Sequence, residues 1–319
     1  MNQNKLILVL SGGFSEEAAI SKISASEIKK SLDKLEYETV MIDPLDFGSY
    51  AEMSQKIKSL HPFIVFNGLH GTDGEDGKIQ ALFELDNIPF SGSNSRSSAL
   101  AMDKFLSGYV ALQLNIKIPK RIILESLGDF NLKYIKEKFD FPIVVKPNDS
   151  GSSVGIAIIA NENELFNAVK EAFQYSRKVL IENFIDGREL TVTILDGKAL
   201  PVVEIKPQNG WYDFVNKYTK GKTIYETPAK LTKKITEEIQ VKAALIFRTI
   251  GCSVYARVDF RFDGKDLYFL EVNTLPGMTP LSLTPMAAKA AGFSFEQLLA
   301  EIIRISLGKK LKDSLRRKL

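Results

Sequence analysis

Residues 256–279 read ARVDFRFDGKDLYFLEVNTLPGMT, and this stretch has the strongest pattern for predicting the fold. Two runs rich in aromatic and β-branched residues flank an Asp-Gly turn, which predicts a β-hairpin. Because side chains alternate between the two faces of a strand, we expect Glu271 and Asn273 to share a face with Phe269. Burying a carboxylate there without a partner costs several kcal/mol, so this pair needs a physical cause.

The first strand of the hairpin offers a cause, because it has Arg257 and Asp259 on one face. If the strands pair across the turn, Asp259 faces Glu271 and Asn273. Two carboxylates and an amide oxygen are hard ligands, which suit Mg²⁺ better than a soft transition metal. The pattern alone leaves open the alternative that Arg257 by itself neutralises an Asp–Glu pair, at about even odds.

The N-terminal part of the chain has the pattern of an α/β domain with a parallel sheet. Apolar runs of strand length at 5–10, 39–43 and 63–67 alternate with helical periodicity. The first helix is predicted from apolar residues at mostly three- and four-residue steps, which are Ile20, Ile23, Ile28, Leu32 and Leu35. A cluster of Pro, Gly and Ser at 88–95 predicts the end of this unit.

Two further units follow. The second begins with a predicted helix at 97–114 and continues through strands at 141–147, 156–160 and 178–184. The third is more antiparallel, because it contains a second Asp-Gly hairpin in addition to the one described above. A long connection within 206–229 lacks periodicity, and connections of that length are usually functional lids or disordered.

The composition excludes several classes of protein. The net charge is +3, with much of the basic excess in the last twelve residues, and no basic stripe interleaved with aromatics indicates nucleic-acid binding. The only cysteine is Cys252, so neither a disulfide framework nor a cysteine metal cluster is expected. No apolar run approaches the roughly 18 residues of a membrane span, so we expect a soluble, cytoplasmic protein without membrane contact.

Three loops at predicted strand ends carry candidate binding residues. KPNDSGSSVG (146–155) places Lys146 beside a Gly/Ser-rich loop whose N–H groups suit a phosphate, although a flexible turn with a surface lysine is the alternative. NGLHGTDGEDG (67–77) contains His70, and SGGFSEE (11–17) ends on Glu17. Ligands on parallel sheets bind beyond the carboxyl ends of the strands, although the acidic residues can also be explained as helix-end residues.

These motifs, taken together and in order, resemble the D-alanine–D-alanine ligases of the ATP-grasp superfamily. The resemblance covers essentially the whole chain and adds SGSNSRSSALAMDK, LIENFIDGRELTV and WYDFVNKY to the segments quoted above. It implies a three-domain ATP-grasp fold of class α/β (α+β), with a substrate domain at 1–95, a central lobe at 96–183 and a catalytic lobe at 184–319. The last two would enclose ATP, with the segment at about 206–229 as a lid.

The resemblance also implies an ATP-dependent reaction that joins two D-alanines through an acylphosphate, with Mg²⁺ or Mn²⁺, as two ions, at Asp259, Glu271 and Asn273. The implied ATP-binding residues are Lys104, Lys146, Glu182, Asn183, Ile185, Glu189 and Lys217. The implied catalytic residues are Glu17, Ser152, Tyr218, Arg257 and Gly277. The implied substrate-binding residues are His70, Ser282 and Leu283. Relatives are commonly homodimers in the cytoplasm that supply dipeptide for peptidoglycan.

The chain departs from the family pattern at a few positions. Ala18 and Ala19 replace a frequent Arg-Glu pair, and Leu281 replaces a frequent histidine before Ser282. None of these is an implied catalytic group. Tyr218 is retained, which favours peptide over D-alanyl–D-lactate ester formation. The competing hypotheses are another ATP-grasp amino-acid or depsipeptide ligase, and an ATP-binding regulatory protein without turnover.

Overall fold

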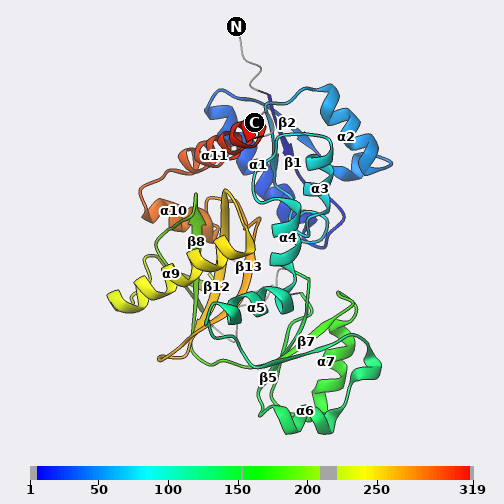
Figure 1. Ribbon diagram of the computed structural model, residues 1–319, viewed down its shortest axis with the longest axis vertical. Helices are drawn as coiled ribbons and strands as arrows, with labels where there is room; N and C mark the ends of the chain where they lie inside the picture. Colours follow the sequence, from blue (N-terminus) through cyan, green and yellow to red (C-terminus); the bar gives the residue numbers. More distant parts are fainter. Residues whose placement is uncertain (1–5, 152–153, 209–220, 317–319) are drawn as a thin grey trace.

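The computed structural model describes residues 6–151, 154–208 and 221–316, and its elements form three sheets with covering helices (Figure 1). The strands are β1 Leu6–Leu10, β2 Glu38–Ile42, β3 Ile64–Asn67, β4 Arg121–Leu124, β5 Ile143–Pro147, β6 Ala157–Ile159, β7 Val179–Asn183, β8 Arg188–Leu195, β9 Lys198–Ala199, β10 Val203–Pro207, β11 Thr223–Glu226, β12 Tyr255–Phe262 and β13 Leu267–Asn273. The α-helices are α1 Ala18–Lys34, α2 Tyr50–Ser59, α3 Lys78–Leu85, α4 Ser95–Met102, α5 Lys104–Gln113, α6 Leu132–Lys138, α7 Leu165–Ala172, α9 Lys233–Ile250, α10 Leu283–Ala290 and α11 Phe295–Arg316. Three 3₁₀ turns lie at Pro44–Asp46, Leu127–Asp129 and Glu162–Glu164.

The N-terminal sheet is parallel, as the alternating pattern predicts, with strand order β2-β1-β3. Alternate residues of β1 enter different cores. Ile7 and Val9 pack with α1 and α11, whereas Leu8 and Leu10 pack with α2 and α3. The sheet is thus covered on both faces, which is the usual arrangement of parallel strands.

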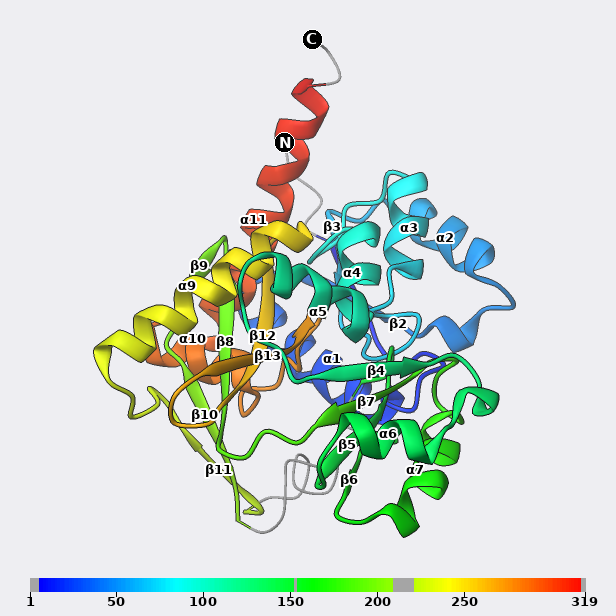
Figure 2. The same ribbon diagram turned by 60° about the horizontal axis from the view of Figure 1, so that its bottom comes forward.

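The central sheet is antiparallel, with order β4-β7-β5-β6, and it has a core of its own. That core joins the inner residues of β5 and β7 to the apolar side of α6 and α7. Figure 2 shows these two helices on one side of the sheet, away from α9. This lobe is therefore a separate layer, with its other side turned to the rest of the molecule.

The C-terminal sheet has the order β11-β10-β8-β12-β13, with β9 paired to β8. Both predicted Asp-Gly hairpins are confirmed, because β8 pairs with β9 and β12 pairs with β13 across those turns. On β12, Ala256, Val258 and Phe260 enter the core under α9, whereas Arg257 and Asp259 face the other side. One face of this sheet is thus apolar and the other is polar.

A β-bulge corrects one expectation about β13. Asp259 lies opposite Glu271, but the next pair is Phe260 with Phe269, so Leu270 is the extra residue. The extra residue changes the alternation, because both Phe269 and Val272 enter the core. Phe269 therefore does not share a face with Glu271, and the carboxylate does not enter the apolar core.

The predicted helix at 97–114 is also wrong in one respect, because the structure divides it into α4 and α5. The break lies at Asp103, whose backbone is extended and whose side chain accepts a hydrogen bond of 2.8 Å from the N–H of Leu106. An aspartate that caps a helix in this way competes with helix continuation. The break makes Lys104 the first residue of α5, where its ammonium group pairs with Glu271 of β13.

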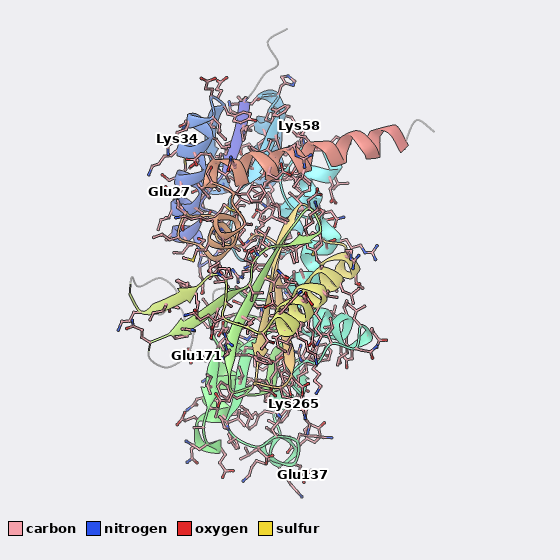
Figure 3. All side chains as sticks on the ribbon, turned by 90° about the vertical axis from the view of Figure 1, so that its left-hand side faces the viewer. Glu27, Lys34, Lys58, Glu137, Glu171 and Lys265 are labelled. Atoms are coloured by element: carbon pink, nitrogen blue, oxygen red, sulfur yellow. The ribbon has the colours of Figure 1, made fainter. Side chains whose placement is uncertain are left out.

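Helices α4 and α5 share their core with the C-terminal sheet, through Ala101 and Ala111, and Ile116 after α5 joins the same core. The C-terminal helix α11 returns to the N-terminal sheet, where it packs on α1 and β3. Figure 3 shows α11 crossing that end of the molecule, with Lys34 beside it on α1, and Lys34 forms an ion pair of 3.2 Å with Glu296. Within the described residues, no helix has the length and apolarity required to span a membrane.

Candidate active site

Two adjoining cavities lie where the three sheets meet. The larger has a volume of about 480 Å³ and the smaller about 110 Å³. Lys104, Arg257 and Glu271 line both, so they form the boundary between the two. Every described residue among the sequence-predicted site residues lines at least one cavity. The larger cavity contains Glu17, His70, Asn273, Gly277, Ser282 and Leu283, and the smaller contains Lys146, Glu182, Asn183, Ile185, Glu189 and Asp259.

A row of polar side chains crosses the open face of the C-terminal sheet. Thr191 of β8 lies opposite Asp259 of β12, which lies opposite Glu271 of β13. The Thr191 hydroxyl donates to Asp259 Oδ1 at 2.5 Å, and Arg257 contacts both oxygens of the same carboxylate through Nε and Nη2, at 2.8–3.2 Å. Asp259 is thus held from two sides while buried.

Glu271 has a different partner from Asp259. The Nζ of Lys104, from the first turn of α5, lies 3.1 Å from Glu271 Oε2. Arg257 alone therefore does not neutralise the two carboxylates, because a second cation arrives from another part of the chain. Both carboxylates and the Asn273 amide oxygen are hard donors on neighbouring strands, so their chemistry and placement fit a divalent cation. Mg²⁺ takes six oxygen ligands, so these three side chains could supply only part of its coordination shell.

The smaller cavity is lined by a buried charge cluster between β4, β5 and β7. Glu182 forms ion pairs with Lys146, at 2.6 Å, and with Arg121, at 2.9 Å, and all three side chains are almost completely buried. Burial lowers the pKa of the Lys146 ammonium below its usual value, despite the opposing effect of Glu182. Two cations against one carboxylate leave a positive excess, which favours an anionic ligand.

The segment after β7 adds apolar lining to this cavity through Phe184 and Ile185, and Glu189 of β8 also lines it. The Nη2 of Arg261 lies 3.6 Å from Glu189 Oε2. A cavity with both apolar lining and a positive cluster suits a nucleotide, since the base and the phosphates need different surroundings.

At the N-terminal end of the larger cavity, Glu17 and His70 come from the loops that follow β1 and β3. His70 is fixed by both ring nitrogens, because Nε2 lies 3.0 Å from Ser24 Oγ and Nδ1 lies 3.1 Å from the carbonyl oxygen of Leu275. Glu75 Oε1 is 3.6 Å from the same Nδ1. Burial disfavours the charged ring, but the carboxylates of Glu75 and Glu17 outweigh it and raise the pKa of His70 above its usual value.

Gly151 makes room for this acidic end of the cavity. A Cβ atom at Gly151 would lie 2.4 Å from Glu17 Oε1, which no side chain could adopt without displacing the carboxylate. The Gly-rich loop after β5 therefore approaches Glu17 closely through its backbone. A buried carboxylate in an open cavity suits the ammonium group of an amino acid.

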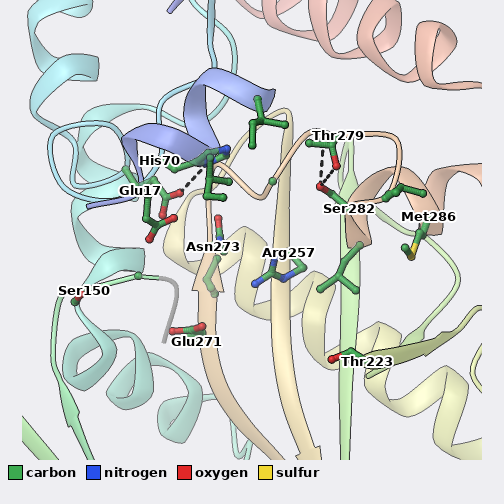
Figure 4. A pocket seen from close by; sticks show the side chains of 18 of the residues that line it. Glu17, His70, Ser150, Thr223, Arg257, Glu271, Asn273, Thr279, Ser282 and Met286 are labelled. Atoms are coloured by element: carbon green, nitrogen blue, oxygen red, sulfur yellow. Dashed lines mark hydrogen bonds and ion pairs between the residues drawn. The ribbon is translucent and has the colours of Figure 1, made fainter. Parts of the chain in front are cut away.

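At the other end of the larger cavity, Ser282 and Leu283 stand at the start of α10. Ser282 Oγ is 2.9 Å from Thr279 Oγ1, as the dashed lines in Figure 4 show. A Cβ at Gly277 would approach Ser282 Oγ to 3.1 Å, so the glycine leaves this hydroxyl accessible. Arg257 and Asn273 lie between this end and Glu17 in the same view.

Four further residues hold these groups in place without having been predicted: Glu75, Arg121, Thr191 and Thr279. Glu75, Thr191 and Thr279 lie inside the quoted motifs, but nothing in the local sequence indicates their partners. Ile20 and Ile23 of the predicted helix stripe line the larger cavity instead of the core. Three predicted site residues, Ser152, Lys217 and Tyr218, lie outside the described residues.

Two family models match the chain, one described as "D-ala D-ala ligase C-terminus" over residues 115–304 and one as "D-ala D-ala ligase N-terminus" over residues 45–93. Together they cover well over half of the sequence. The chain belongs to the D-alanine–D-alanine ligase family. The resemblance inferred from the motifs is thereby confirmed.

Individual members of the D-alanine–D-alanine ligase family are similar over nearly their whole length. The ligase of Halalkalibacterium halodurans is 40% identical over 313 residues, which cover 95% of this chain and 99% of that protein. The ligase of Methylacidiphilum infernorum is 44% identical over 301 residues, which cover 94% and 95%. The crystal structure of the Bacillus anthracis ligase complexed with ATP superimposes with a TM-score of 0.82 at 34% identity, covering 96% of this chain and 98% of that one. The family fold, ATP-grasp, is confirmed by these matches.

Proposed function

We propose that this protein is an ATP-dependent ligase that joins two D-alanine molecules into D-alanyl-D-alanine for peptidoglycan synthesis. The main support for this function is the arrangement of the two connected cavities. A cavity with a buried carboxylate at one end and a serine hydroxyl at the other opens, through Lys104, Arg257 and Glu271, onto a second cavity with a positive cluster. Two small zwitterions and a nucleotide triphosphate are the ligands that this arrangement fits.

In the proposed reaction, a carboxylate oxygen of the first D-alanine attacks the γ-phosphorus of ATP, and ADP leaves. The amine of the second D-alanine then attacks the acyl carbon, the tetrahedral intermediate expels phosphate, and the amine loses a proton. Glu17 holds the ammonium of the first D-alanine, with His70 beside it. Arg257 and the N–H of Gly277 stabilise the oxyanion, which is the task of preorganised donors.

The remaining roles are proposed from the family resemblance and from the cavity that each residue lines. Lys104 and Lys146 bind phosphates, while Glu182, Asn183, Ile185 and Glu189 surround the base and ribose. Ser282 and Leu283 receive the carboxylate of the second D-alanine. Lys217, Ser152 and Tyr218 are proposed, on family resemblance alone, to contact the γ-phosphate and to complete the group around Glu17.

Mg²⁺, or Mn²⁺ in its place, is proposed to bind at Asp259, Glu271 and Asn273 as two ions, where it would neutralise the charge on the phosphates. In the described structure Arg257 and Lys104 neutralise the two carboxylates. A cation at these oxygens would release both side chains toward the reacting groups. Arg257 and Lys104 line both cavities, so each side chain already lies beside the groups it would contact after the exchange.

We further propose the domain limits 1–95, 96–183 and 184–319, with a lid at about 206–229, and a cytoplasmic homodimer. The separate core of β4–β7 with α6 and α7 supports a distinct central lobe. Helices α4 and α5, within the proposed central range, also pack on β13 of the proposed catalytic lobe.

The experiment is a phosphate-release assay with Mg·ATP and identification of the product by mass spectrometry. D-alanine should stimulate release and give the dipeptide, whereas L-alanine should not. Equal stimulation by L-alanine would contradict the stereochemical assignment. A preference for D-lactate as second substrate would instead support the depsipeptide alternative, and ATP binding without turnover would support the regulatory one.

A further inference from the structure

We propose that Thr279 is a positioning residue that orients the hydroxyl of Ser282 toward the carboxylate of the acceptor amino acid. This inference rests on the proposed function, because it takes the second D-alanine as the ligand at Ser282. It assigns a role to a residue that neither the motifs nor the resemblance singled out.

The first observation is that the side chain of Ser282 does not cap α10, although Ser282 stands at the start of that helix. It occupies the N-cap of α10, where a serine side chain normally accepts from an N–H of the first turn. Among the described residues it makes no such capping bond. The third helix residue is Pro285, which has no N–H to offer.

The second observation is where the hydroxyl of Ser282 is held instead. The N–H of Thr279 donates to Ser282 Oγ at 3.1 Å, and the two hydroxyl oxygens lie 2.9 Å apart. The N–H of Ser282 donates back to the carbonyl oxygen of Thr279 at 2.8 Å, which closes a tight turn between the residues. Figure 4 shows both side chains meeting at the edge of the cavity.

The number of hydrogen bonds that each hydroxyl can make decides which proton is left for a ligand. A hydroxyl has one proton and two lone pairs. One lone pair of Ser282 Oγ already accepts from the backbone of Thr279. If the Thr279 hydroxyl also donates to it, both lone pairs are used, and the Ser282 proton can only be donated elsewhere.

Both side chains line the larger cavity, so the remaining proton is available to a ligand there. In the reverse arrangement Ser282 donates to Thr279, and the free proton belongs to Thr279. The pair thus presents one donor, on Ser282 Oγ in the first arrangement and on Thr279 Oγ1, 2.9 Å away, in the second. The first arrangement is the one proposed here, and a carboxylate is an acceptor-only group that suits this donor. Gly277, whose missing side chain leaves space beside Ser282 Oγ, keeps that donor accessible.

The test is a set of steady-state measurements on purified full-length variants. Thr279→Val keeps the shape of the side chain but removes the hydroxyl. We expect the Michaelis constant of the second D-alanine to rise about 3- to 10-fold, which corresponds to one hydrogen bond, while those of ATP and the first D-alanine stay within about twofold. Thr279→Ser should restore most of the lost affinity.

A double-mutant cycle shows whether Thr279 acts through Ser282. In a Ser282→Ala background, Thr279→Val should add less than about a twofold effect, because the hydroxyl it orients is gone. Thr236→Val, which removes a hydroxyl on α9 that bonds the carbonyl oxygen of Thr232, is the matched control for the change of residue type.

Three results would overturn the inference: an unchanged Michaelis constant for the second D-alanine in Thr279→Val, no rescue by serine, or full additivity with Ser282→Ala. Each of these requires that the wild-type protein makes the dipeptide. If the wild type does not make it, the proposed function fails first, so the two failures are distinguishable. If Thr279→Val does not fold, Thr279→Ala, which also removes the hydroxyl, replaces it in the same cycle, and full additivity with Ser282→Ala contradicts the proposal.

Discussion

At the scale of single residues, the polar row on the C-terminal sheet shows how a buried carboxylate is made tolerable. Asp259 receives one hydrogen bond from Thr191 and several from Arg257. A charge-assisted hydrogen bond is stronger than a neutral one, and an unpaired buried charge is costly. The carboxylate is therefore held in one orientation before any ligand arrives.

The Thr191 hydroxyl should matter for metal-dependent turnover. Thr191→Val keeps the packing but removes one donor to Asp259, so the carboxylate can rotate away from the position that would bind Mg²⁺. We expect the Mg²⁺ concentration for half-maximal activity to rise about 3- to 10-fold. Thr193→Val, on the same strand and face, is the control, because its partner is Thr284 on α10. An identical Mg²⁺ requirement in the wild type and Thr191→Val would contradict this role.

His70 should titrate above its ordinary value, and NMR can measure this because the sequence has only two histidines. The pKa of His70 is raised by Glu75 and Glu17 against the effect of burial. Glu75→Gln should lower it. A pKa of His70 below 6.5 in the wild type, or a rise in the variant, would show that burial dominates instead.

The raised pKa of His70 also makes the free energy of unfolding depend on pH in a defined direction. A histidine whose pKa is raised on folding contributes stability that is complete below pH 6.5 and is lost as the pH rises through the raised value. The free energy of unfolding of the wild type should therefore fall above pH 6.5. Urea unfolding of the wild type and His70→Gln at several pH values measures this, and the fall should be smaller in the variant.

At the scale of elements, the bulge in β13 decides which residues face the cavities. Without the extra residue, the alternation that places Phe269 in the core would place Glu271 there too. With it, Phe269 packs edge-to-face on Phe260, with ring centroids 6.1 Å apart, while Leu270 lines the smaller cavity. One inserted residue thus reconciles an apolar core with a polar binding face.

Two alanine variants in neighbouring positions test that assignment. Phe269→Ala should reduce the free energy of unfolding by about 3–5 kcal/mol, because it removes a fully buried ring. Leu270→Ala should cost much less stability but should raise the Michaelis constant for ATP. Chemical denaturation and steady-state kinetics provide the two measurements. Equal losses of stability would contradict the placement of Leu270 at the cavity and outside the core.

At the scale of the whole molecule, the site exists only because three separate layers meet. The smaller cavity has Lys146 and Glu182 from the central sheet on one side and Asp259 and Glu271 from the C-terminal sheet on the other. The central lobe has its own core, so it depends little on apolar contacts with its neighbours. A nucleotide between the sheets would therefore act as a connection between them.

Nucleotide should stabilise both sides of that cavity together. With Mg·ADP at about 100 times its dissociation constant, the free energy of unfolding should rise by about 2.7 kcal/mol. Amide exchange should slow in β5, β7, β12 and β13, but not in α2. Lys146→Met should reduce the effect. Protection confined to one sheet would contradict a nucleotide bound between the two.

Much of this architecture could be predicted from short stretches of the sequence. The turn chemistry at Asp263 and Gly264 predicts the hairpin. The register next to that turn would place Asp259 opposite Leu270, and only the bulge brings Asp259 opposite Glu271. The parallel sheet follows from alternating apolar runs and helices. These features depend on residues close together in the chain, so local sequence determines them.

Only the tertiary structure decided which residues contact the polar side chains of the site. The contact of His70 with Leu275 joins residues 205 positions apart, and Lys104 reaches Glu271 only because α4 and α5 are separate helices packed on β13. The bulge at Leu270 reflects the need to pack Phe269 while leaving Glu271 accessible. Local sequence therefore determined the donors and cations of this site. Only the packing of distant elements decided which of them meet, since the energy of a buried charge depends on neighbours that the local pattern does not specify.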